Sequence, residues 1–172
     1  MKIIDYINRK RRERILCKLA AIPHKKRLPR LDDVRTIGII LYGNTSEEDK
    51  QTLNLFNSHM IKRNILVTCY RLPLIDDKEN LTRIGLPTAD HLATFTSHTY
   101  DVLIAATRAN DNRTLFAVLN TPAHLRVAYD DTDILPDPIA TETYDLFIRG
   151  TGECHLVDLL REVLSLLSKI KK

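Results

Sequence analysis

The chain has 172 residues, of which 44% are hydrophobic and 28% are charged, and it carries a formal net charge of +4. This apolar content excludes a disordered chain, and five Gly with seven Pro are too few for a fibrous or low-complexity protein. The charge is unevenly distributed: residues 1–30 hold eleven Lys and Arg against two acidic residues, a balance of +9, whereas residues 31–172 hold 15 against 20, a balance of −5. The length favours one domain that folds without disulfides or metal.

Residues 1–22 contain neither Gly nor Pro and place Ile and Leu at spacings of three and four, which predicts a basic N-terminal helix. The stretch from Asn8 to Arg14 has no apolar residue, so we expect this helix to dock by its ends at most. Pro23 and Pro29 indicate a linker. We therefore predict a helical arm with its linker over residues 1–30 and an α/β domain over residues 31–172.

Beyond the linker, β-branched apolar runs alternate with helical patterns. Strands are predicted at 34–42, 65–70, 100–106, 125–129 and 144–148, and helices at 47–63, 89–95, 112–119 and 153–172. The pattern is broken elsewhere in 71–99, and 130–142 is predicted as an acidic loop with two prolines. This alternation predicts an open, mostly parallel sheet of about five strands, flavodoxin-like or half-Rossmann.

Three segments carry a resemblance to known proteins: 100–104, 123–129 and 144–148, the last followed by a Leu-rich helix. Together with the basic N-terminal helix they resemble a small uncharacterised family of Bacteroidetes-type bacteria, although Ala128 stands where that family's pattern has Gly. The same stretch also resembles one half of the heptosyltransferase-type glycosyltransferases. That resemblance implies a sugar nucleotide held between two Rossmann-like domains, of which this chain supplies one.

The cysteines and the hydropathy pattern bear on location. Cys17, Cys69 and Cys154 are widely spaced and odd in number, which favours a reducing compartment. There is no secretory-signal pattern and no apolar run of about 20 residues, so we predict a cytoplasmic protein without a transmembrane segment.

The basic arm is the first candidate site. If the helix stays exposed, it presents a positive surface that suits an anionic partner, either a nucleic acid or an anionic membrane surface. The alternative is a solvated arm that pairs with the acidic remainder, within one chain or across a homo-oligomer. The predicted contact residues are Arg9, Lys10, Arg11, Arg12, Arg14 and Lys18.

The second candidate site lies at the carboxyl ends of the predicted strands, where open α/β sheets bind ligands. The acidic stretch that begins at Asp130 could hold Mg²⁺, but a solvated loop is the ordinary explanation, since the stretch lacks the calcium-loop spacing. We therefore predict neither a metal nor a cofactor. The predicted ligand-binding residues are Gly43, Asn44, Thr45, Ser46, Thr107, Arg108, Asp130 and Asp131.

Catalytic signatures are missing from the sequence. Gly150-Thr151-Gly152 is interpreted as a turn before a helix, and Cys154 as a partly buried structural thiol. No pattern nominates a general base, so no catalytic residue is predicted. The leading hypothesis is a non-catalytic interaction module with a basic helix for an anionic partner. The alternatives are a nucleotide- or sugar-nucleotide-binding transferase-like enzyme acting as an oligomer, and a purely structural assembly protein.

Overall fold

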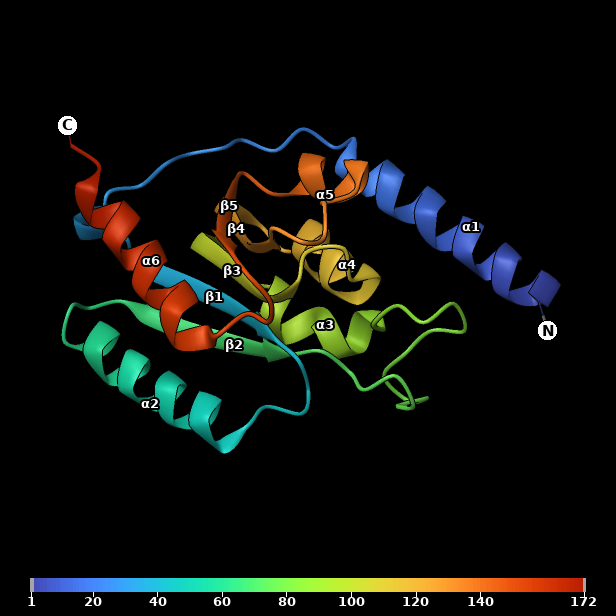
Figure 1. The fold of residues 1–172 in the computed structure, drawn as a ribbon, viewed down its shortest axis with the longest axis horizontal. Coiled ribbons are helices and arrows are strands. Elements are labelled where there is room, and N and C mark those ends of the chain that lie inside the picture. Colours follow the sequence, from blue (N-terminus) through green and yellow to red (C-terminus); the bar gives the residue numbers. More distant parts are fainter. Residues whose placement is uncertain (1, 172) are drawn as a thin grey trace.

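A computed structural model describes residues 2–171, which form one open sheet of five parallel strands in the order β2-β1-β3-β4-β5 (Figure 1). The strands are β1 (Thr36–Leu41), β2 (Leu66–Arg71), β3 (Tyr100–Arg108), β4 (Ala123–Asp131) and β5 (Leu146–Gly150). This order is the flavodoxin-like one, so the predicted fold class is confirmed. Residues 1 and 172, the outer ends of the predicted first and last helices, lie outside the described residues.

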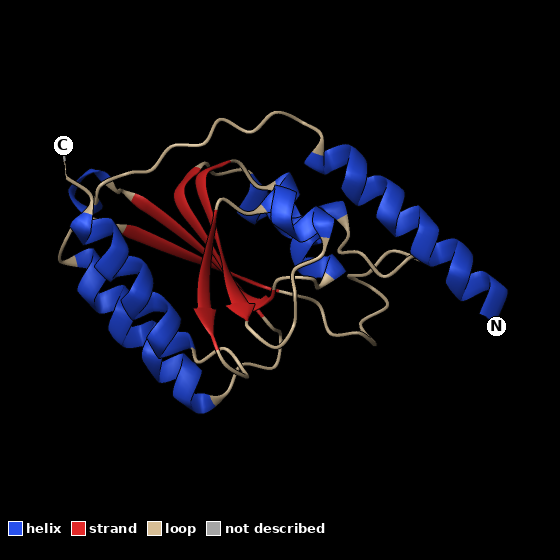
Figure 2. Ribbon diagram, turned by 45° about the horizontal axis from the view of Figure 1, so that its top comes forward, coloured by secondary structure: helices blue, strands red, loops and turns tan. Residues whose placement is uncertain are grey.

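Helices cover both faces of the sheet (Figure 2). Two long helices, α2 (Glu47–Ile61) and α6 (Leu156–Lys169), lie side by side on one face and share a core with alternate residues of β1, β3 and β4. The other face is covered by α3 (Ala89–Thr96), α4 (Asn112–Asn120) and α5 (Pro138–Thr143). A short 3-10 turn, η1 (Leu31–Asp33), precedes β1. Because both faces are covered, the central strands are continuously apolar rather than alternating.

The helix α3 forms within residues 71–99, the segment whose sequence pattern was broken. The hydroxyl of Thr88 caps the helix by accepting a hydrogen bond from the main-chain N–H of His91 at 3.3 Å. The ring of Phe95 then stacks on Tyr100 with 4.9 Å between centroids, and the Tyr100 hydroxyl donates to the Phe95 carbonyl at 3.0 Å. Both rings lie against Gly38 of β1, where a Cβ atom would come within 3.1 Å of each.

The N-terminal helix α1 (Lys2–Ala20) packs on α4 and α5 through its C-terminal half, and its first turns project beyond the body of the molecule (Figure 1). Leu16 is its one fully buried side chain within the described residues. Residues 21–30, the linker, then run along the amino-terminal edge of the sheet, where the Arg27 N–H donates to the His124 carbonyl at 2.9 Å. The division of the chain near residue 31 stays a prediction.

Several predicted boundaries differ from the structure, and two of the differences have a clear local cause. Residues 130–142 are not simply a loop, because β4 continues to Asp131, paired with Gly150 of β5, and Asp137 then caps α5. Pro138 is no obstacle there, since the first turn of a helix needs no N–H from it. The last helix begins at Leu156 rather than at residue 153, because the backbone of His155 is extended, with φ −86° and ψ 115°, and this residue forms the N-cap.

Candidate functional site

The strand order creates a cleft at the carboxyl edge of the sheet. From β1 the chain crosses to β2 on one side, and from β2 it returns to β3 on the other, so the loops that leave β1 and β3 diverge. Such a switch point opens a crevice in which α/β proteins hold ligands. Here it is a cleft of about 990 Å³, which is large enough for a nucleotide-sized molecule.

Most of the residues predicted from the strand ends line this cleft. Thr107 and Arg108 come from β3, Asp130 and Asp131 from β4, and Asn44 and Thr45 from the loop after β1. The structure therefore brings these six together, while their role in binding stays a prediction.

Gly43 and Ser46 do not line the cleft. The Ser46 hydroxyl instead caps α2 by accepting the Asp49 N–H at 3.1 Å. Gly43 passes close to the next loop, where a Cβ atom would lie 2.7 Å from the Leu72 carbonyl oxygen. Both residues shape the loop rather than face the cleft.

Among the lining residues that were not predicted, three fix the positions of the loops around the cleft. Tyr42 accepts a hydrogen bond from the Arg108 N–H at 3.0 Å, which ties the loops after β1 and β3 together. Asp111 caps α4 by accepting the N–H groups of Arg113 and Thr114. The Arg113 guanidinium pairs with Asp111 at 2.9 Å and donates to the Pro73 carbonyl at 2.8 Å, so it braces two loops. Tyr42 directly follows β1 and Asp111 directly precedes a predicted helix, and these positions were the available signals; no local pattern indicates the Arg113 contacts.

The cleft has an acidic lining. Its charged residues are Asp49, Asp111, Asp130, Asp131 and Glu153 against Arg108 and Arg113. The Asp131 carboxylate accepts the N–H groups of Asp133 at 3.0 Å and Gly152 at 3.3 Å, and Asp130 lies 3.5 Å from the Arg149 guanidinium. No group of three or more metal-ligating side chains is arranged to hold a metal ion within residues 2–171. A phosphorylated ligand would therefore meet more repulsion than attraction from these side chains.

The turn before α6 closes one side of the cleft. Gly150 is required by packing, since a Cβ atom there would lie 2.6 Å from the Tyr129 hydroxyl oxygen. Cys154 lies before α6 rather than on it, and burial, together with the nearby Asp49 and Asp158, raises the pKa of its thiol to about 12. This thiol is therefore protonated at neutral pH and unlike an activated nucleophile.

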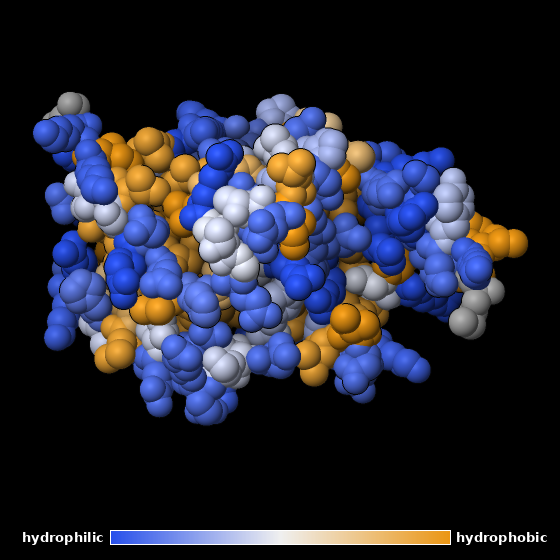
Figure 3. Space-filling view, viewed as in Figure 1, coloured by the Kyte–Doolittle hydropathy of each residue, from blue (hydrophilic) through white to orange (hydrophobic). Residues whose placement is uncertain are grey.

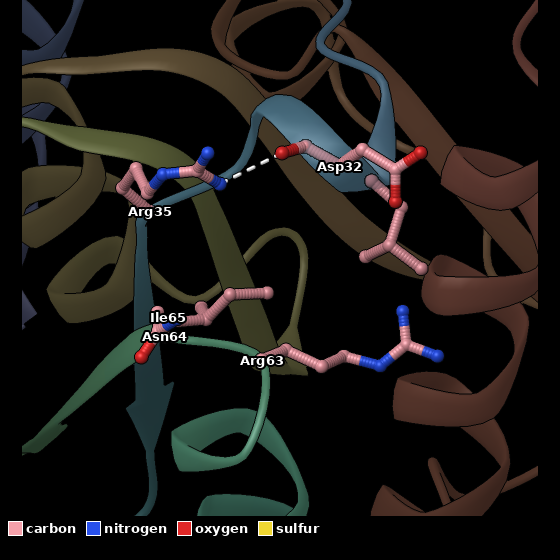
Figure 4. A pocket seen from close by; sticks show the side chains of 6 residues that line it. Asp32, Arg35, Arg63, Asn64 and Ile65 are labelled. Atoms are coloured by element: carbon pink, nitrogen blue, oxygen red, sulfur yellow. Dashed lines mark hydrogen bonds between the residues drawn. The ribbon is translucent and has the colours of Figure 1, made fainter.

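A second, smaller pocket of about 310 Å³ lies at the opposite, amino-terminal edge of the sheet (Figure 4). The Arg35 guanidinium turns toward the Asp32 main-chain carbonyl and donates to it at 2.7 Å. The Arg63 side chain extends toward the side of the pocket on which the Asp32 carboxylate lies. None of the predicted site residues lines this pocket.

The basic residues of α1 divide into two groups. The first group consists of exposed side chains: Arg9, Lys10, Arg11, Arg14 and Lys18. Within residues 2–171 their ion pairs are both with Glu13 of the same helix, from Lys10 at 2.9 Å and from Arg9 at 3.9 Å. The hydrogen bond from Lys10, followed by the charges of Lys10, Arg9 and Arg12, lowers the pKa of Glu13.

Arg12 belongs to the other group, because it is half-buried. Its Nη1 donates to the Ile84 carbonyl at 2.9 Å, and its Nε has no partner within residues 2–171. Its guanidinium therefore holds α1 against the loop that precedes α3, and sequence alone did not separate it from its neighbours.

No helix within residues 2–171 is long and apolar enough to cross a membrane. The predicted cytoplasmic location stays a prediction.

The fold and its cleft define a flavodoxin-like α/β protein to which a basic helix is added on one face. Residues 8–170 match a family of unknown function, DUF6913, and the chain therefore belongs to that family. No curated protein matches the chain. The predicted resemblance to an uncharacterised family is confirmed at this level, whereas the bacterial group and the heptosyltransferase-type resemblance stay predictions.

Proposed function

We propose that this protein is a non-catalytic interaction module whose helix α1 binds an anionic partner, a nucleic acid or an anionic membrane surface. The observation that carries this proposal is the row of exposed cations on a helix that projects from the body: Arg9, Lys10, Arg11, Arg14 and Lys18. Each Lys or Arg near an anionic surface contributes about 1 kcal/mol at moderate salt. Arg12 is left out of the proposed surface because its guanidinium is turned inward.

The alternative, in which the arm pairs with the acidic residues of its own chain, is supported only at the linker, where His24 pairs with Asp145 and Arg30 with Asp33. The ion pairs of the α1 cations within residues 2–171 are to Glu13 of the same helix, while Asp130 lies near Arg149 and Asp137 caps α5. The body, which carries the negative balance, therefore leaves the cations of α1 available to a second molecule.

The test is a charge reversal on the exposed face of α1, Arg11→Glu with Arg14→Glu and Lys18→Glu. The parent protein should be retained on duplex nucleic acid or on anionic vesicles at low salt and released as salt rises, because binding releases counterions. The variant should lose that retention.

The matched control reverses three exposed cations at the other end of the molecule, Lys62→Glu with Lys169→Glu and Lys171→Glu. It changes the net charge equally but leaves α1 intact, so it should bind like the parent. Equal retention of the two variants would show that α1 is not the binding surface.

A second candidate function is the binding of a nucleotide or sugar nucleotide, supported by the cleft of about 990 Å³ at the switch point. Ligand at 100 times its dissociation constant adds about 2.7 kcal/mol of stability, which a thermal-shift measurement detects. Because the cleft is acidic, a phosphorylated ligand should shift the melting temperature more with Mg²⁺ than without it. Arg108→Ala should remove the shift and Lys62→Ala should keep it. The absence of any shift with millimolar ligand in the parent protein would contradict this function.

A further inference from the structure

The first two turns of α1 expose a cluster of apolar side chains. Ile3 is 75% exposed, Ile4 62%, Tyr6 54% and Ile7 43%. Figure 3 shows hydrophobic side chains gathered at the outer end of α1, next to strongly hydrophilic ones. Apolar side chains gathered at one place on a surface, and rimmed by polar ones, mark an interaction site more often than single exposed side chains do.

The three isoleucines of the apolar cluster and four of the five exposed cations occupy one side of the helix, and the exception is Arg9, which projects toward the side of Leu16. With 3.6 residues per turn, Ile3, Ile7, Arg14 and Lys18 project within about 60° of one another, whereas the buried Leu16 projects to the opposite side. The side of α1 that faces away from α4 and α5 is therefore apolar over its first two turns and basic over the turns that follow.

This order along the axis matches an anionic bilayer surface, where hydrocarbon lies directly beneath charged phosphate groups. Amphipathic interfacial helices combine the same two features, apolar side chains in the acyl boundary and Lys or Arg on the headgroups. Tyr6 fits the pattern because tyrosine rings are enriched at membrane–water interfaces.

A nucleic acid fits this end of α1 less well. It offers no hydrocarbon layer for three isoleucines, and the one aromatic ring is already occupied. The Arg9 guanidinium lies 5.4 Å and the Lys10 amine 6.0 Å from the Tyr6 ring centroid. A base that stacked on Tyr6 would therefore compete with these two cations for the ring.

A second copy of the chain also fits less well. Parallel packing of two apolar clusters would bring Lys10 and Arg14 of one copy near those of the other, and like charges brought together oppose association. Antiparallel packing would separate these cations but would leave them without an anionic partner. Of the three occupants, an anionic lipid surface alone matches the apolar residues and the cations together.

We propose that α1 attaches the protein to an anionic lipid surface, with Ile3, Ile4, Tyr6 and Ile7 in the interface and Arg11, Arg14 and Lys18 on lipid phosphates. This inference rests on the proposed function and names its partner. Because Leu16 and Arg12 already fix α1 to the body, the helix is ordered before it binds, which lowers the entropy lost on binding. The attachment is reversible and lies within the interface, since the helix does not span.

The first experiment measures flotation with vesicles of phosphatidylcholine alone and of phosphatidylcholine mixed with phosphatidylglycerol. The parent should partition onto the mixed vesicles, and Ile3→Ser with Ile4→Ser and Ile7→Ser should lower that partitioning by about tenfold or more. Unchanged partitioning of this variant would overturn the inference.

The control removes an equal number of exposed apolar side chains from the body, Leu55→Ser with Ile61→Ser and Leu66→Ser. These residues are 74%, 59% and 59% exposed, so the two variants are matched in lost apolar surface. The control should partition like the parent. If it loses as much as the α1 variant, general surface hydrophobicity explains the binding and the inference fails.

The second experiment uses the absence of tryptophan from the sequence. Ile4→Trp places a single fluorophore in the cluster, and its emission should shift to the blue with mixed vesicles and be quenched by brominated lipid. Leu55→Trp should show neither effect. If the Ile4→Trp variant floats with vesicles but its emission is neither shifted nor quenched, the side chain at position 4 stays in water and the inference that this cluster enters the interface is wrong.

The two proposals fail in different ways. Binding to duplex nucleic acid without binding to mixed vesicles would overturn the lipid inference and leave the proposed function standing. A parent protein that binds neither, or a charge-reversed Arg11, Arg14 and Lys18 variant that binds both like the parent, would overturn the proposed function itself. Concentration-dependent dimerisation abolished by the three Ser substitutions, without vesicle binding, would assign the cluster to a second copy instead.

Discussion

The Nε2 atom of His24 lies 2.9 Å from Oδ2 of Asp145, although the two residues are 121 positions apart in the chain. The same carboxylate oxygen accepts the main-chain N–H of Arg126 at 2.8 Å. One mostly buried carboxylate therefore holds the linker against the amino-terminal ends of β4 and β5.

Asp145→Ala should lower the free energy of unfolding by about 1–3 kcal/mol, because His24 and the Arg126 N–H lose their acceptor in a mostly buried place. Urea unfolding measures the change. Asp158→Ala is the control: its pair with Arg161 is exposed, so that substitution should stay within about 0.5 kcal/mol of the parent. Equal effects of the two substitutions would show that the Asp145 contacts contribute nothing to stability.

Leu16→Ala tests whether α1 and its linker form a separate part, as predicted. The substitution removes the fully buried side chain that holds α1 on α4 and α5, a loss of about 2–5 kcal/mol of packing. Amide hydrogen exchange in α1 and the linker should become faster while the five strands keep their protection. Ile4→Ala, on the exposed end of the same helix, should change neither. Faster exchange throughout the sheet after Leu16→Ala would mean that α1 unfolds together with the domain.

Tyr144→Phe should leave the stability unchanged or raise it by up to about 1 kcal/mol. The Tyr144 hydroxyl is buried without a hydrogen-bond partner within residues 2–171, and burial raises its pKa far above the ordinary range. Tyr100→Phe is the comparison: its hydroxyl donates to the Phe95 carbonyl, so its removal should lower stability by about 1 kcal/mol. Thermal unfolding of both variants measures these changes in stability. A clear loss of stability in Tyr144→Phe would reveal a hydrogen-bond partner for that hydroxyl.

Cys154 should resist alkylation by iodoacetamide compared with the exposed Cys17. Because the pKa of the Cys154 thiol is raised to about 12, only about one thiol in ten thousand is ionised at pH 8. The rate at Cys154 should keep rising with pH up to the highest pH at which the protein stays folded, since the thiolate fraction grows about tenfold per pH unit below the pKa. Peptide mass analysis identifies the labelled residue, and labelling in urea shows that both thiols are reactive once unfolded. A rate at Cys154 that levels off near neutral pH would contradict the raised pKa.

Local patterns in the sequence account for most of the fold. The apolar run of β1 and the Leu-rich face of α6 are properties of neighbouring residues, so strand and helix were evident without tertiary contacts. The last residues of β4 were not, because Asp130 and Asp131 become strand only by pairing with Arg149 and Gly150 of β5. Acidic residues followed by prolines favour a loop when that pairing is unknown.

The candidate cleft also combines residues that the sequence predicted with residues that only tertiary contacts place there. That Arg108 and Asp130 would meet at the carboxyl edge followed from the parallel sheet, since strand ends gather there whatever the side chains. That Arg113 braces two loops depended on the path of the Pro73 loop, which no local pattern encodes.

The basic helix shows the division most directly. Its composition alone determined a strongly cationic N-terminal segment. Only the packing of Leu16 against α4 and α5 decided the rotation of the helix, which turns Arg12 inward to Ile84 and leaves Arg11, Arg14 and the isoleucines of the first turns in solvent. The physical reason is that a helix displays all its side chains equally until one face is buried, and the choice of that face is a tertiary contact.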